Sequence, residues 1–190
     1  MAAIFGYGED ALTLWFLKNQ LEVILHRFKD NTKPLDCLAF YRPSFGRSGG
    51  PESAEFGEFD AIVASKENVY LIESKWDNHR QSKPKELILR PEQTGRHEVF
   101  RWYLSNWNNG EKSAELTGGK KIAPANSLLA TNLQHILTQL RQCCPNSAHS
   151  EHVKNILLYF HSANSKPPQK VSDGFTVVPV EYEGNYYVNL

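Results

Sequence analysis

Two strand-like segments joined by a short polar turn constrain the fold of this chain more than any other feature. Residues 58–64 and 69–76 are rich in β-branched and aromatic side chains, and residues 65–68 between them are typical of a turn. We therefore predict an antiparallel hairpin.

The second of these strands carries an acid and a base on an otherwise apolar face. Because successive side chains point to opposite faces of a strand, Glu73 and Lys75 continue the face that begins with Val69 and Leu71. A solvated edge would show polar residues along its whole face, so charged groups at the end of an apolar one need an explanation.

The length of the turn predicts which residue faces Glu73. An even loop centred between Lys66 and Glu67 places Asp60 directly opposite, whereas an odd loop would shift the register by one residue. Opposed side chains have Cβ atoms about 4.5 to 5.5 Å apart, and like charges there are destabilising unless something neutralises them. A divalent cation would do so, and two carboxylates that leave positions for water and phosphate oxygens suit Mg²⁺.

Lys75 lies two residues beyond Glu73 on the same face and can place a compact positive charge beside such an ion. It would orient an attacking water or stabilise charge on the phosphorane, while a metal that lowers the pKa of its bound water suits phosphodiester hydrolysis. The same ligands would serve a hydrolase of another phosphate ester. The structural alternative is that Glu73 and Lys75 neutralise each other while Asp60 pairs with an arginine.

Asp60 in one strand and the string Glu73-Ser74-Lys75 in the next resemble the PD-(D/E)xK nuclease superfamily, with Phe59 standing where the family has a proline. The resemblance implies a restriction-endonuclease-like α/β fold, which is a three-layer α/β/α core with a central mixed sheet flanked by helices. It also implies that Asp60 and Glu73 bind Mg²⁺, with Mn²⁺ as a substitute, and that Lys75 is catalytic. The implied substrate is DNA.

Residues 9–28 are predicted to form a helix, because apolar residues recur there at spacings of three and four. Nucleases of this superfamily often carry a glutamate close to the start of the first helix. The resemblance matches it to Glu9, which would be a catalytic residue and a third metal ligand. Helical phase favours Asp10 instead, since it lies on the centre of the apolar stripe. Both acids would also complement the helix dipole.

A second helical stretch is expected from about Pro84 to Trp107, with a kink near Pro91. In several branches of the superfamily this helix contributes a glutamine or a basic residue, so the resemblance makes Gln93 a further catalytic candidate. The alternative is a polar side chain on a solvated helical face. The family does not need His97 for catalysis, and no second histidine lies at a zinc-like spacing from it.

Charge patterning limits nucleic-acid binding to a local patch. The chain has 21 Lys and Arg residues and 21 Asp and Glu residues, so its net field does not attract a polyanion. Between Lys75 and Arg101, however, seven basic residues outnumber four acidic ones. The candidates for DNA contacts are Arg80, Lys83, Lys85, Arg90, Arg96 and Arg101.

The remaining pattern fits a single domain over residues 1–190. Further strands are expected at 35–41, 155–160, 175–180 and 186–188, and a further helix at 126–143. Together these elements indicate a mixed α/β layer. No apolar run approaches the roughly 18 residues of a spanning helix, and the tripartite order of a secretion signal is missing, so we expect a cytoplasmic protein without a membrane partner. A homodimer is compatible with these features.

Two hypotheses follow from the sequence. The first is a Mg²⁺-dependent endo- or exodeoxyribonuclease that hydrolyses phosphodiester bonds of DNA. The second is a catalytically inactive module of the same fold that binds nucleic acid or another partner. The missing GxxxxGK[ST] string argues against an enzyme driven by NTP.

Overall fold

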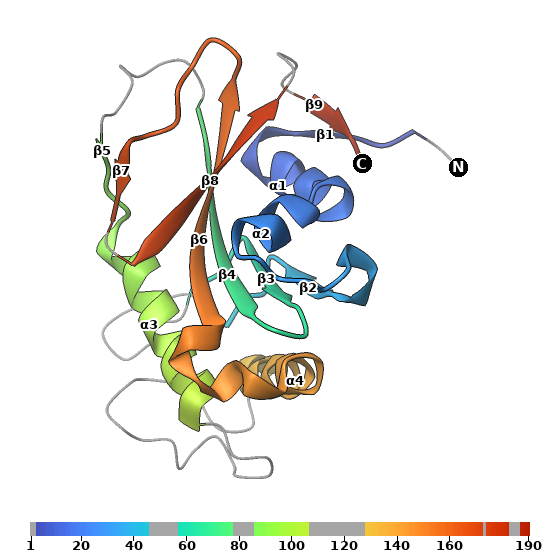
Figure 1. Cartoon of the computed structure of the whole chain (residues 1–190), viewed down its shortest axis with the longest axis vertical. Coiled ribbons are helices and arrows are strands. Elements are labelled where there is room, and N and C mark those ends of the chain that lie inside the picture. Colours follow the sequence, from blue (N-terminus) through green and yellow to red (C-terminus); the bar gives the residue numbers. More distant parts are fainter. Residues whose placement is uncertain (1–2, 46–56, 78–85, 107–127, 173, 183–186) are drawn as a thin grey trace.

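The computed structural model describes residues 3–45, 57–77, 86–106, 128–172, 174–182 and 187–190 (Figure 1). The strands are β1 (Phe5–Tyr7), β2 (Leu38–Tyr41), β3 (Ala61–Ala64), β4 (Val69–Trp76), β5 (Glu86–Leu87), β6 (Val153–Ser162), β7 (Lys170–Val171), β8 (Phe175–Tyr182) and β9 (Tyr187–Asn189). The α-helices are α1 (Gly8–Asn19), α2 (Glu22–Arg27), α3 (Pro91–Asn106) and α4 (Leu128–Cys143). Short 3₁₀ helices occupy Pro34–Asp36, Pro145–Ala148 and Ser150–His152.

The centre of the molecule is a mixed five-stranded sheet in the order β2-β3-β4-β6-β8. β3 runs antiparallel to both of its neighbours, whereas β4, β6 and β8 are parallel to one another. Two short ribbons are formed by β1 with β9 and by β5 with β7. The expectation of a mixed α/β fold is therefore correct.

Helices cover both faces of this sheet (Figure 1). α1 and α2 lie on one face, in a buried apolar cluster that includes Phe16 and Tyr70. α3 and α4 lie on the other face, in a second cluster that includes Phe100 and Leu71. Because alternate side chains of β4 enter opposite clusters, both faces of the strand are buried, which explains its nearly continuous apolar sequence.

The predicted hairpin is confirmed. The strand expected at Val69–Trp76 is present with those bounds, and it pairs with β3 so that Ala61 lies opposite Ile72. When this register is continued by one residue, Asp60 lies opposite Glu73, as the even loop predicts. A one-residue slip would have moved Asp60 to the other face of the sheet.

Two predicted boundaries differ from the structure because periodicity alone does not locate chain breaks. The helix expected at 9–28 is interrupted at Gln20, where the chain leaves the helical conformation. Both halves pack apolar residues on the same sheet face, so the stripe continues across the break. The strand expected at 58–64 is regular only in its last four residues, although Glu58 forms an isolated bridge to Ser44.

Proline explains two further differences. The strand expected at 35–41 begins only at Leu38, because Pro34 opens a 3₁₀ turn. The helical stretch expected from Pro84 begins at Pro91, which is the first residue of α3 rather than a kink within it. Proline is favoured at that position because the first helical N–H has no intrahelical partner.

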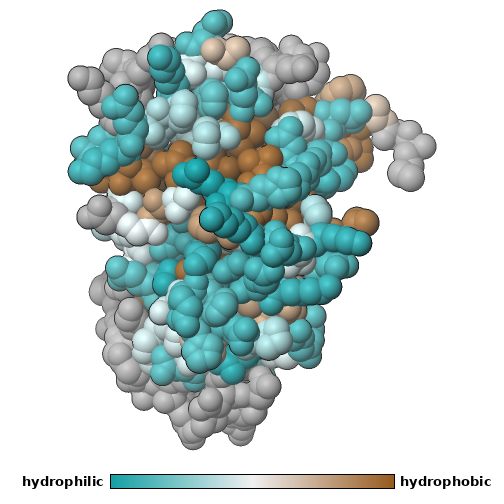
Figure 2. Space-filling view, in the orientation of Figure 1, coloured by the Kyte–Doolittle hydropathy of each residue, from teal (hydrophilic) through white to brown (hydrophobic). Residues whose placement is uncertain are grey.

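The ribbon of β1 and β9 packs tightly on α1. A Cβ placed on Gly6 would lie 2.6 Å from Ala11 Cβ and 2.7 Å from Leu190 Cδ1, so only glycine permits this approach. The outer side chains of the ribbon, among them Phe5 and Tyr7, are exposed. Figure 2 shows a band of apolar side chains across the upper half of the viewed face, with hydrophilic side chains above it and over the lower half. None of the helices in the described ranges has the length and apolar composition that a bilayer crossing needs.

The turn of the hairpin is anchored by a buried carboxylate. Asp30 Oδ2 accepts hydrogen bonds from the hydroxyl of Ser65, from Asn68 Nδ2 at 3.1 Å and from the Tyr70 hydroxyl at 2.7 Å. Asp30 Oδ1 accepts a bond from the Thr32 backbone N–H at 2.9 Å. Burial raises the pKa of Asp30, but the hydrogen bonds outweigh it and hold the pKa at about 2.

We predict that Asp30→Asn lowers the free energy of unfolding by about 1.5 to 3 kcal/mol at neutral pH, because it removes a charged acceptor shared by several donors. Since the folded pKa is depressed, the contribution of Asp30 is full above the ordinary value of 3.8 and declines as pH falls toward about 2. Urea denaturation of both proteins between pH 2 and 7 measures this, with the gap shrinking on acidification. Asp36→Asn, which removes an exposed carboxylate paired with Lys66, is the control and should change little.

Candidate active site

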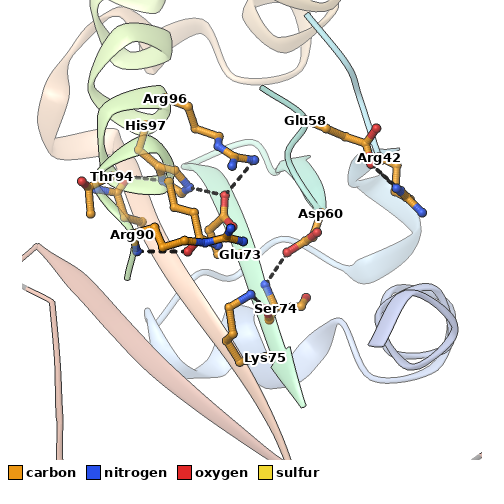
Figure 3. Close-up of polar contacts among 12 residues, drawn as sticks. Arg42, Glu58, Asp60, Glu73, Ser74, Lys75, Arg90, Thr94, Arg96 and His97 are labelled. Atoms are coloured by element: carbon orange, nitrogen blue, oxygen red, sulfur yellow. Dashed lines mark hydrogen bonds and ion pairs between the residues drawn. The ribbon is translucent and has the colours of Figure 1, made fainter. Parts of the chain in front are cut away.

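Figure 3 shows the acidic pair predicted from the hairpin, with Asp60 beside Ser74 and Glu73 directed toward His97 and Arg96 of α3. Asp60 directly precedes β3, and its neighbour Ile62 belongs to the apolar cluster beneath α3 and α4. Leu71, two residues before Glu73, belongs to the same cluster. Glu73 points toward α3, where its side-chain partners lie, and its charge is close enough to raise the pKa of Asp60. Asp60 Oδ2 also accepts a 2.6 Å hydrogen bond from the Ser74 N–H, which ties it to β4.

Asp60 is held in an environment that disfavours its charge. Burial raises its pKa to about 7, and the nearby carboxyl groups of Glu73 and Glu9 add to the increase. The Ser74 N–H and the Lys75 ammonium act in the opposite direction. A bound cation would stabilise the charged form of Asp60, because its positive charge would offset both the loss of hydration and the repulsion from Glu73 and Glu9.

Glu73 is almost completely buried, with 1% of its surface exposed. Its Oε2 accepts a 2.8 Å bond from Gln93 Nε2. Its Oε1 lies 3.3 Å from His97 Nε2 and 3.4 Å from the Arg96 guanidinium. All three partners belong to α3, and Arg96 and His97 follow Gln93 by three and four positions, so one helical face supplies these three contacts.

Gln93 is not on a solvated helical face, which was the structural alternative for it. Its side chain is buried, and its Oε1 accepts a 3.1 Å hydrogen bond from the Arg90 N–H at the start of α3. The same amide group therefore caps the helix with its oxygen and holds Glu73 with its nitrogen. The structure thus brings Gln93 to the predicted site.

Glu9, rather than Asp10, reaches this part of the sheet. Glu9 Oε2 accepts a 2.9 Å bond from the Trp76 N–H, and its Oε1 lies 3.6 Å from Lys75 Nζ. Asp10 turns outward into an ion pair with Arg42. Helical phase favoured Asp10 because the predicted stripe ran through Leu14 and Leu17. The residues buried in α1 include instead Leu12, Thr13 and Phe16, which lie three, four and seven positions after Glu9. Burial raises the pKa of Glu9, against the opposing effects of Lys75 and the Trp76 N–H.

Lys75 lies among the three acids. Its Nζ donates a 2.6 Å hydrogen bond to the Ser74 carbonyl, and its charge lowers the pKa of both Asp60 and Glu9. The structural alternative, in which Lys75 is neutralised by Glu73, is not what the contacts show. The ion-pair partner of Lys75 is Glu9, and that of Glu73 is Arg96.

The basic candidates separate into different groups. Arg96 packs over the Phe59 ring and pairs with Glu73, in a space that exists because Gly57 has no side chain. A Cβ on Gly57 would lie 3.1 Å from Arg96 Cζ. Arg101 donates to the carbonyls of Val153 and Ser150, so it ties α3 to the sheet instead of facing the site. Arg90 is exposed at the start of α3. Arg80, Lys83 and Lys85 lie outside the described residues.

The sequence analysis set His97 aside as not needed for catalysis, and it did not identify Asn155. His97 is buried, contacts Glu73 through one ring nitrogen and lies 3.1 Å from Asn155 Oδ1 through the other. The signal that could have found His97 is its position four residues after Gln93, on the same helical face. Nothing in the sequence indicates Asn155, because its contact depends on how β6 aligns with β4.

The donor chemistry of the site fits a hard cation such as Mg²⁺. Asp60, Glu73 and Glu9 offer carboxylate oxygens, and Mg²⁺ typically takes one or two of these and fills its remaining positions with water and phosphate. Among the described residues, no three His, Cys, Asp or Glu side chains already form a cage for a metal ion. No family model, curated protein or solved structure matches the chain.

We predict that Asp60→Asn makes the protein more stable at neutral and higher pH in the presence of EDTA. Because the folded pKa of Asp60 is raised, its favourable contribution is present below the ordinary value of 3.8 and is lost as pH rises through about 7. Thermal unfolding between pH 4 and 9 should show the melting temperature of the wild type falling relative to that of the variant. Glu9→Gln should act in the same direction. Parallel curves for wild type and Asp60→Asn would contradict the prediction.

Proposed function

We propose that this protein is a metal-dependent nuclease that hydrolyses phosphodiester bonds of DNA, with a restriction-endonuclease-like fold of the PD-(D/E)xK type. The observation that carries the proposal is the convergence of Asp60, Glu73, Glu9 and Lys75, in which Lys75 contacts Glu9 at 3.6 Å while burial and the charges of Glu73 and Glu9 raise the pKa of Asp60. A carboxyl group placed where its own charge is disfavoured is a frequent feature of functional sites. The sequence resemblance and the mixed sheet agree with the proposal.

In this proposal Asp60 and Glu73 hold Mg²⁺, or Mn²⁺ in its place, and Glu9 completes the acidic set. When bound, the cation would lower the pKa of a coordinated water and polarise the scissile phosphate. Lys75 would hold and orient the attacking water, since its ammonium is partly exposed and reaches Glu9 at 3.6 Å. Gln93 keeps Glu73 in place through its 2.8 Å hydrogen bond.

The DNA-binding contribution would come from a limited region. The chain has no net charge, so attraction for a phosphate backbone depends on local groups. Arg90, exposed at the start of α3, is the described residue best placed for this role. Arg96 is engaged with Glu73, and Arg101 with backbone carbonyls, so neither is available for DNA in this conformation.

The proposal is tested by incubating the protein with labelled single-stranded, duplex and branched DNA in Mg²⁺ or Mn²⁺. We expect cleavage by the wild type, and none above background for Asp60→Asn and Glu73→Gln. Lys75→Met should lower kcat by about 10² to 10⁴, the range of a positioned group that handles the proton of the nucleophile. Lys66→Met, which removes an exposed lysine from the same hairpin, is the matched control and should retain full activity.

Failure of the wild type to cleave any of these substrates better than Asp60→Asn would remove the enzyme assignment. Cleavage that persists in Glu73→Gln would show that another group holds the cation.

One observation favours the second candidate, a nuclease-fold module that binds without turnover. Arg96 already compensates the charge of Glu73 at 3.4 Å, which a protein without a metal ion would need in order to bury that carboxylate. Calorimetry with Mn²⁺ separates the candidates. A nuclease binds Mn²⁺ and loses this binding in Asp60→Asn and in Glu73→Gln, whereas a module gives no heat that depends on these residues.

A further inference from the structure

His97 is enclosed on every side at the point where α3 meets the sheet. Only 1% of its surface is exposed. Its ring lies between those of Phe59, at a centroid distance of 4.9 Å, and Phe175, at 4.7 Å. These two aromatic rings come from the segment that precedes β3 and from β8, so the imidazole has little freedom to rotate or shift.

Both ring nitrogens of His97 contact polar groups on neighbouring parallel strands. Nε2 lies 3.3 Å from Glu73 Oε1 on β4, and Nδ1 lies 3.1 Å from Asn155 Oδ1 on β6. A carboxylate oxygen only accepts hydrogen bonds, so Nε2 is the donor in the contact with Glu73. Nδ1 of a neutral ring then accepts, so Asn155 holds the opposite side of the ring by donating from its amide group, whose nitrogen and oxygen exchange places on a flip. The contacts of Asn155 and Glu73 with the two ring nitrogens therefore also restrain the imidazole within its own plane.

The two carboxylate oxygens of Glu73 differ in the number of contacts they make. A carboxylate has about four lone-pair positions, two on each oxygen. Within the described part of the chain, Oε1 is approached by both His97 and Arg96, whereas Oε2 accepts one hydrogen bond, from Gln93. Oε2 is thus the less engaged of the two oxygens, and it is the one that would remain for a bound cation.

We propose that His97, held by Asn155, is a positioning residue that fixes the Glu73 carboxylate so that Oε2 is presented to the divalent ion. The inference rests on the proposed function, since it assigns a role within the same site. It is the converse of the familiar arrangement in which a carboxylate orients a metal-bound histidine, and partners of that kind contribute to metal affinity.

A purely structural role for His97 would be to dock α3 on the sheet, and matched variants separate the two roles. His97→Phe keeps an aromatic ring between Phe59 and Phe175 but removes both polar contacts. His97→Gln keeps a donor, and Asn155→Leu removes only the second contact. Phe100→Leu disturbs the packing of α3 in the apolar cluster, through a residue with no polar contact to the site.

The measurements are Mn²⁺ affinity by calorimetry, the Mg²⁺ dependence of kcat, and the melting temperature of each variant. We expect His97→Phe to weaken Mn²⁺ binding by about 10- to 100-fold, the range found for groups that orient a metal ligand. Asn155→Leu should act in the same direction, and His97→Gln should regain most of the affinity. KM for DNA should be unchanged in all of them. Phe100→Leu should lower the melting temperature without changing the affinity for Mn²⁺.

Two results would overturn the inference while leaving the proposed function intact. One is wild-type Mn²⁺ affinity in both His97→Phe and Asn155→Leu. The other is an equal loss of affinity in Phe100→Leu, which would show that helix docking alone is responsible. If the wild type itself binds no Mn²⁺ and Glu73→Gln behaves identically, the proposed function fails, and the role of His97 fails with it.

Discussion

The register between β3 and β4 is the constraint on which the rest of the site depends. It is set at the turn, where the buried carboxylate of Asp30 accepts hydrogen bonds from Ser65, Asn68 and Tyr70. With the turn fixed, Ala61 lies opposite Ile72, and the next position brings two acids together. A shift of one residue would reverse the faces of β3, so the geometry of the acidic pair follows from hydrogen bonds at the opposite end of the hairpin.

The second requirement is a means of burying Glu73. An unpaired carboxylate at this depth would be strongly destabilising, and a paired one still needs its remaining lone pairs satisfied. α3 meets this requirement with Gln93, Arg96 and His97, which lie on one helical face. The same helix is fixed by apolar contacts with the sheet and by the hydrogen bonds of Arg101 to backbone carbonyls. His97 and Arg96 also pack against the Phe59 ring, so the burial of Glu73 and the docking of α3 depend partly on the same residues.

The sequence allowed prediction of those features that depend on local patterns. Alternation of side chains identified β4 with its bounds, and the turn length gave the position of Asp60 relative to Glu73. Contacts between residues of different elements could not be predicted in the same way, because they depend on how the helices pack on the sheet. Helical phase favoured Asp10 over Glu9, although only Glu9 contacts Lys75. The contact between His97 and Asn155 joins residues 58 positions apart and depends on how α3 docks across β6.

The close packing at Gly6 has a consequence for the acidic cluster. The strand that contains Gly6 is held on one side by the final residues of the chain and on the other by Ala11 of α1, which follows Glu9 by two positions. The pairing of β9 with β1 therefore supports α1, the helix that carries Glu9 to within 3.6 Å of Lys75. Any side chain at position 6 would press on Ala11 and displace α1. It would thereby change the position of Glu9 relative to Lys75.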